Sequence, residues 1–254
     1  MEKFFNDLLF KEGGVYTLLG SKPVTEVVLY HYTDEEMAEL QKHLTPEELE
    51  NCYVDDQYDL PKNWERWEKY SSDKPLKRHL LFRSHYSEDG KSSYVYFVDI
   101  VKTALLLQDN YDLFAREVGF VFNPLEVVLE MPSKTSAFWE KVRESRNATL
   151  LWGLLFGYGK ENASLFSWKY LSKSEKTSNF VKHLPCTYSN PPPVGKVELT
   201  IENLLLPSFV SFTLEDKVLD KYIKERKEIQ LIYKQNDLLT YTLQQLGVDD
   251  HEHK

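Results

Sequence analysis

The chain has 254 residues, of which 42% are hydrophobic and 28% are charged, and its formal net charge is -9. This composition is typical of a soluble globular protein with one large core or two small ones. An acidic balance works against non-specific binding to nucleic acid or to a membrane surface. Apolar stretches stop short of the ~18 residues that a membrane span requires. We therefore expect no nucleic-acid partner and no transmembrane segment.

The N-terminal residues predict a helix followed by two strands. Residues 2–10 (EKFFNDLLF) place phenylalanine and leucine side chains on one helical face, and Gly13-Gly14 ends that helix. Residues 15–33 (VYTLLGSKPVTEVVLYHYT) then predict two short strands on either side of the turn at residues 20–23. The chain is therefore expected to pass from a helix into extended structure.

Two threonines have the pattern of a capping box, in which a hydroxyl at the helix start accepts a hydrogen bond from the amide three positions later. They are Thr33 with Glu36, and Thr45 with Glu48, where Pro46 also suits the first helical position. The acidic residues of these patterns are expected to cap helices and not to act in catalysis.

The middle of the chain predicts a hairpin followed by helices. Residues 79–100 alternate in side-chain direction around Asp89-Gly90, where glycine permits the positive φ of a tight turn. A helix is expected over residues 101–118, and Gly119 is expected to end it. Residues 136–156 predict a single long helix.

Prolines divide the chain near its C-terminal end. Pro185 and Pro191-Pro192-Pro193 predict a stiff loop, residues 197–212 one or two strands, and residues 214–246 a long helix. We therefore expect an α+β fold, predominantly helical, with a small antiparallel sheet built from hairpins. Its expected parts are a main α+β domain over 1–184, a Pro-rich crossing over 185–200, and a C-terminal strand–helix unit over 201–254 that packs on the main domain.

The predicted terminal helix has apolar residues at alternating steps of four and three, which is a heptad pattern. Its candidate interface residues are Ile229, Ile232, Asn236, Leu239 and Leu243. A buried amide at Asn236 would set the register at some cost in stability. Two interpretations stay open: this face packs on the protein's own core, or it binds a protein partner or a second copy of the chain.

The sequence contains none of the motifs that identify a nucleophile elbow, a phosphate-binding loop, a dinucleotide-binding turn or a zinc-protease helix. Cys52 and Cys186 belong to no CxxC pair and have no histidine at metal-ligand spacing. We therefore expect free thiols, and we assign no catalytic residues, no cofactor and no metal ligands. A non-catalytic protein is favoured, and an enzyme stays open.

One segment, LLFGYGKENASLF at residues 154–166, has the local chemistry of an anion site. An apolar run stops at Gly157 and Gly159, and a new helix begins near Lys160. Unpaired amides at a helix start attract anions, and Lys160 adds a positive charge. Asn162 falls in the first turn, where its side chain can bond back to the loop. The simpler interpretation is a corner between two helices.

A second glycine-containing loop, residues 13–22, ends on a lysine. If the two loops meet in space, they would bind an anionic ligand. The candidate ligand-binding residues are then Lys22, Gly157, Gly159, Lys160 and Asn162. Proximity of Lys22 to Lys160 in a concave pocket would favour this site, and wide separation would argue against it.

GGVYTLLGSKPVT (residues 13–25) and LLWGLLFGYGKENASLF (residues 150–166) together resemble a family of uncharacterised proteins of intracellular bacteria, which are often exported or lipoprotein-like. The resemblance implies an exported fate and no particular activity. The chain differs from the lipoprotein form because it lacks a leader and its cysteine. By sequence it is soluble and cytoplasmic, with export as the alternative if a leader has been removed.

We therefore expect a non-catalytic interaction or envelope-associated protein. The alternative is an enzyme or a small-ligand binder that uses the loops at residues 13–22 and 157–162 around an anionic ligand.

Overall fold

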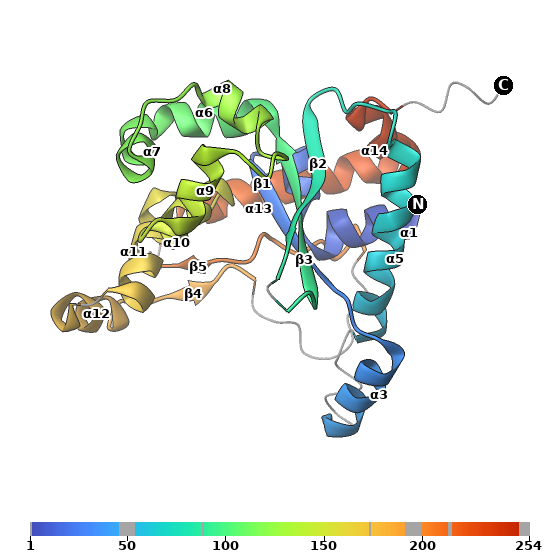
Figure 1. Ribbon diagram of the computed structural model, residues 1–254, viewed down its shortest axis with the longest axis horizontal. Coiled ribbons are helices and arrows are strands. Elements are labelled where there is room, and N and C mark those ends of the chain that lie inside the picture. Colours follow the sequence, from blue (N-terminus) through green and yellow to red (C-terminus); the bar gives the residue numbers. More distant parts are fainter. Residues whose placement is uncertain are drawn as a thin grey trace.

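The computed structural model describes residues 2–45, 54–87, 89–172, 174–190, 200–212 and 215–248. It confirms a predominantly helical α+β fold with a small antiparallel sheet (Figure 1). Helices lie on both sides of a three-stranded sheet, and two short strands pair separately. Within the described ranges, no helix has the combined length and apolar character needed to cross a bilayer.

The three-stranded sheet has the order β1-β3-β2, and both pairings are antiparallel. β2 (His79–Tyr86) and β3 (Ser92–Asp99) form the predicted hairpin, and β1 (Val24–Tyr30) pairs with the other edge of β3. Gly90 in the connecting turn has a φ of +71°, a conformation that glycine adopts without steric cost. The hairpin prediction is therefore confirmed.

The N-terminal segment is helical throughout its first part. α1 (Glu2–Asn6) continues as a π-helical turn, η1 (Asp7–Lys11), and α2 (Val15–Leu18) follows. The prediction of a strand at residues 15–19 is therefore wrong. All four residues of α2 are buried, and a short apolar run of this kind does not distinguish a strand from a buried helix by its pattern alone.

The predicted capping box at Thr33 is confirmed at the start of α3 (Asp34–His43). The Thr33 hydroxyl accepts from the Glu36 amide at 3.2 Å, and the Glu36 carboxylate accepts from the Thr33 amide at 3.0 Å. The second expected box includes Glu48, which lies outside the described residues.

Two helices predicted as continuous are each divided in the structure. The helices of this region are α6 (Ile100–Asp109), α7 (Tyr111–Val118), α8 (Pro124–Leu129), α9 (Ala137–Glu144) and α10 (Ala148–Leu155). Asn110 separates α6 from α7, and residues 145–147 separate α9 from α10. Gly119 ends α7 with a φ of +84°, as predicted. Apolar side chains continue on both sides of each break, so hydrophobic periodicity does not show where the breaks fall.

The C-terminal part also contains more elements than expected. They are α11 (Lys160–Leu171), α12 (Glu175–Lys182), β4 (Thr187–Tyr188), β5 (Val210–Ser211), α13 (Lys217–Gln235) and α14 (Leu238–Leu246). The prediction of one helix over residues 214–246 is wrong, because the chain breaks between α13 and α14. Asp237 caps α14, since its carboxylate accepts from the Thr240 amide at 2.9 Å.

The break removes the continuous heptad face. Asn236 is exposed at the end of α13 and does not occupy a buried register position. Ile229 is 2% exposed and Leu243 is 7% exposed, and both lie within the protein's own core. Leu239 packs against that core, and Ile232 is half-buried. Three of the five candidate interface residues, Ile229, Leu239 and Leu243, therefore pack inside this chain.

Side chains of the central strand alternate between two hydrophobic cores. Val95 and Phe97 face core 1, which joins α1, η1, α2, α5 (Val54–Ser71), α13 and α14. Tyr96 and Val98 face core 2, which joins α6 to α10. Successive strand residues point to opposite faces, and helices cover both faces here. The C-terminal helices thus share core 1 with the N-terminal segment.

A buried ionic junction links the end of β3 to its neighbours. Asp99 accepts from the Lys102 amide at 2.9 Å, which caps α6, and its other carboxylate oxygen lies 2.8 Å from Lys102 Nζ and 3.1 Å from Arg78 Nε. His79 is buried beside it, with Nε2 at 3.7 Å from the same oxygen. Burial holds the pKa of His79 below its ordinary value against the opposing effect of Asp99. His79 is therefore neutral in the folded protein at neutral pH.

We predict that His79 makes folding less favourable as the pH falls below about 6.5, the ordinary histidine pKa. In that pH range His79 binds a proton in the unfolded chain but not in the folded protein. The free energy of unfolding therefore decreases toward acid pH. His79→Gln should reduce the loss of stability between about pH 7 and about pH 5, measured by urea denaturation at each pH. His43→Gln, at an exposed position, is the control. Equal losses in His79→Gln and the parent would contradict this account.

Candidate functional site

The segment at residues 154–166 forms the predicted stop and restart between two helices. α10 ends at Leu155, and α11 begins at Lys160. Between them, Gly157 has a φ of +78° and Gly159 a φ of +79°. Residues with a Cβ rarely adopt this conformation, so both glycines are required for the corner.

Gly157 also lies against two other segments of the chain. A Cβ at this position would be 3.6 Å from Lys22 Cα and 3.2 Å from Pro23 Cδ, and it would overlap the hydroxyl of Tyr222. That hydroxyl donates to the Gly157 carbonyl at 3.0 Å. Glycine is needed here for close approach as well as for its φ. The structure therefore brings the loop that ends at Lys22 beside the corner at Gly157.

The candidate residues Lys160 and Asn162 do not lie with Lys22 in a common site. Lys160 is exposed and lines a separate shallow cavity beside the junction of α6 and α7. Asn162 is buried, and its amide donates to the Tyr158 carbonyl at 3.1 Å and to the Asp216 carboxylate at 2.8 Å. Its oxygen accepts from the Phe212 amide at 3.2 Å. Asn162 therefore stabilises the corner, as the sequence predicted. Its side-chain amide and oxygen make their hydrogen bonds within the protein and not to a ligand.

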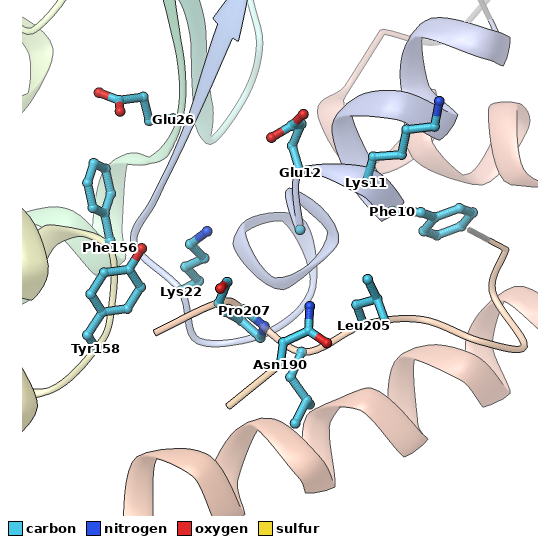
Figure 2. A pocket seen from close by; sticks show the side chains of 13 residues that line it. Phe10, Lys11, Glu12, Lys22, Glu26, Phe156, Tyr158, Asn190, Leu205 and Pro207 are labelled. Atoms are coloured by element: carbon cyan, nitrogen blue, oxygen red, sulfur yellow. The ribbon is translucent and has the colours of Figure 1, made fainter. Parts of the chain in front are cut away.

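A cavity of about 230 Å³ opens beside the Lys22 loop. Its walls come from the end of η1, the start of β1, the corner at Phe156 and Tyr158, and residues 205–208 (Figure 2). We call it the Lys22 cavity. Segments from the beginning, the middle and the end of the chain therefore meet around one small space.

Lys22 is the central cation of this cavity. It is only 6% exposed, and its ammonium group points into the space between Glu12 and Glu26 (Figure 2). Across the described part of the chain, this group makes no hydrogen bond and no ion pair. Burial lowers the pKa of Lys22 to about 8, although both carboxyl groups act in the opposite direction. The side chain is thus a mostly protonated amine without a direct partner in the described ranges.

The two acids flanking Lys22 are held differently. Glu26 accepts a hydrogen bond from the Tyr96 hydroxyl at 2.6 Å, which orients its carboxylate. Burial raises the pKa of Glu26, while Tyr96 and Lys22 lower it. Glu12 reaches solvent, yet the protein around its carboxyl group still raises its pKa, with Lys22 opposing. Burial and the charge of Glu26 raise the pKa of Tyr158 to about 12, so its hydroxyl remains a hydrogen-bond donor.

Sequence reasoning identified Lys22, which lines the cavity, and Gly157, which lies against the Lys22 backbone, and it missed most of the other lining residues. Glu26 had one local signal, since it is a charged residue inside an otherwise apolar strand (VTEVVLY). Glu12 and residues 205–208 had none, because only their distant contacts bring them to the cavity. The arrangement offers a cation, two carboxyl groups and a phenol to a small polar molecule.

Cys186 is an exposed free thiol, and Cys52 lies outside the described residues. Among the residues with described positions, no group of three or more His, Cys, Asp or Glu side chains is placed to hold a metal ion.

Comparison with protein-family models, with curated proteins and with solved structures finds no match to this chain. The resemblance of residues 13–25 and 150–166 to proteins of intracellular bacteria therefore stays a prediction.

We predict that Gly159→Val lowers the free energy of unfolding by more than about 1 kcal/mol, because it forces a β-branched residue to a positive φ. The new Cβ would also lie 2.6 Å from Val218 Cγ2. Lys160→Ala, at the next and exposed position, is the matched control and should leave stability nearly unchanged. Urea denaturation of both variants tests this. A Gly159→Val variant as stable as the parent would show that the corner is unstrained.

Proposed function

We propose that this protein binds a small molecule with a carboxylate group in the Lys22 cavity. One observation carries the proposal: the Lys22 side chain is buried, and its ammonium group faces the cavity without a direct partner among the described residues. Burying a charged group costs free energy unless it is paired and hydrogen-bonded. A ligand carboxylate would supply both the opposite charge and the hydrogen bonds.

The two acidic residues beside Lys22 limit which anions the cavity can bind. Glu12 and Glu26 both act on Lys22 electrostatically, and both line the same cavity. A doubly charged phosphate would be repelled by two carboxylates at close range, whereas a single carboxylate meets a smaller penalty. The Tyr158 hydroxyl lies in the same wall and can donate to the ligand. The cavity therefore suits a singly charged carboxylate better than a phosphate.

We predict that the parent protein binds small carboxylates such as acetate and propionate in a saturable way, and that Lys22→Met weakens this binding by at least ~10-fold. Isothermal titration calorimetry or NMR titration measures it. Lys11→Met is the matched control, because Lys11 lines the same cavity but is paired with Asp7 at 2.9 Å.

The stability of the variant separates binding from a structural role. Without ligand, Lys22→Met should melt at the parent temperature or above it, since it removes a charged side chain that has no direct partner in the part of the chain that the structure describes. A strongly destabilised Lys22→Met variant, or carboxylate binding that persists in it, would contradict the proposal.

A second candidate function is protein interaction, and an exposed apolar surface favours it. Six large apolar residues, each between 40% and 83% exposed, belong to α6, α8 and the connection before α8. They are Val101, Leu105, Phe120, Val121, Leu125 and Leu129. α6 and α8 pack side by side (Figure 1), and exposed apolar surface of this extent is typical of interaction sites.

If this surface joins two copies of the chain, the parent protein should sediment as a dimer whose population rises with concentration. Leu129→Glu should shift it to monomer, because burying an unpaired carboxylate is costly. Leu231→Glu is the matched control, at an equally exposed leucine on α13. Sedimentation of the parent as a monomer at every concentration would exclude self-association through this surface.

A further inference from the structure

A second cavity adjoins the Lys22 cavity and has a different character. Its volume is about 480 Å³, and it shares Phe156, Tyr158 and Ser208 with the first. We call it the aromatic cavity, because four further rings line it. These are Trp152, Phe166, Tyr188 and Phe209. A cavity lined by rings suits a flat apolar group that can stack on them or meet them edge to face.

Four of the six rings that line this cavity contact one another. Trp152 stacks on Phe156 with 5.6 Å between ring centroids, and Tyr158 stacks on Phe209 at 5.5 Å. The floor is equally constrained, since a Cβ on Gly153 of α10 would lie 2.9 Å from Ala163 Cβ of α11. Such mutual packing keeps the cavity formed before a ligand arrives, which lowers the cost of binding.

The charges of the Lys22 cavity are not balanced by a simple carboxylate. Lys22 is one cation, and Glu12 and Glu26 are two acids. A ligand that brings only a negative charge leaves both acids without a counter-charge. A ligand with a carboxylate and an ammonium group can pair with Lys22 through the first and with the acids through the second. The cavity is therefore complementary to a zwitterion.

One tyrosine connects the two cavities physically. The Tyr96 hydroxyl donates to Glu26 at 2.6 Å, and the Tyr96 ring stacks on Trp152 at 5.4 Å between centroids. The acid that faces Lys22 and the indole that lines the aromatic cavity are thus positioned by the same side chain. Their separation is set by one rigid ring.

We infer that the two cavities together form one site for an amino acid with an aromatic side chain. Its carboxylate binds Lys22, its ammonium group lies toward Glu12 and Glu26, and its ring enters the aromatic cavity past Phe156 and Tyr158. The inference rests on the proposed function of the Lys22 cavity and adds the ammonium group and the ring to it.

Four probes that differ by one group each test the inference on the full chain by isothermal titration calorimetry. L-phenylalanine has the carboxylate, the ammonium group and the ring. L-alanine lacks the ring, 3-phenylpropionate lacks the amine, and 2-phenylethylamine lacks the carboxylate. We expect L-phenylalanine to bind at least ~10-fold more tightly than each of the others. Equal affinities for L-phenylalanine and 3-phenylpropionate would show that the ammonium group is not recognised. Equal affinities for L-phenylalanine and L-alanine would show that the ring is not recognised. Either result would overturn the inference.

Two variants assign the groups to their partners. Glu26→Gln should weaken the binding of L-phenylalanine by at least ~10-fold. The same variant should bind 3-phenylpropionate as tightly as the parent does, or more tightly. Phe166→Ala should weaken the binding of L-phenylalanine and leave the binding of L-alanine unchanged. Phe180→Ala, at an exposed ring outside the cavity, is the control. Thermal melts confirm that each variant is folded.

The outcomes separate the two proposals. If carboxylates bind through Lys22 but neither the amine nor the ring adds affinity, the inference fails and the proposed function stands. If no probe depends on Lys22, both fail.

Discussion

The close approach of Gly157 to the Lys22 loop and to Tyr222 is the contact on which the candidate site depends. Tyr222 of α13 donates to the Gly157 carbonyl, and its ring meets Tyr16 edge-on at 5.5 Å. The Ser21 amide donates to Glu225 of the same helix at 3.0 Å. α13 thereby holds the loop and the corner together. Any side chain at position 157 would separate them, and the cavity between them would change shape.

Two buried charged groups near the ends of the sheet differ in how the protein treats them. Asp99 lies beside the Lys102 and Arg78 side chains and accepts from the Lys102 amide, so the fold compensates its charge. Lys22, near the start of β1, is also buried, but among the described residues it has no direct partner and is attracted at longer range by Glu12 and Glu26. An interior normally pairs its charges because desolvation is expensive. This contrast is why Lys22 is interpreted functionally and Asp99 structurally.

Local features were predictable from sequence, and features set by packing were not. The hairpin around Gly90, the capping box at Thr33 and the end of α7 at Gly119 each depend on a few neighbouring residues. The helical form of residues 15–18 and the break at Asn236 do not. A fully buried short segment has no polar face to mark its period, and a helix can stop wherever tertiary contacts favour a turn.

For the candidate site, the sequence by itself determined the residue chemistry: a lysine after one glycine-containing loop, and a corner that only glycines can form. The tertiary structure alone decided which groups meet. It placed Lys22 beside Gly157, directed Lys160 to another surface, and committed Asn162 to Asp216. Backbone conformation follows from short-range sterics, which neighbouring residues reveal. Burial and electrostatic attraction depend on distances between segments far apart in the chain, and only the folded structure defines those distances.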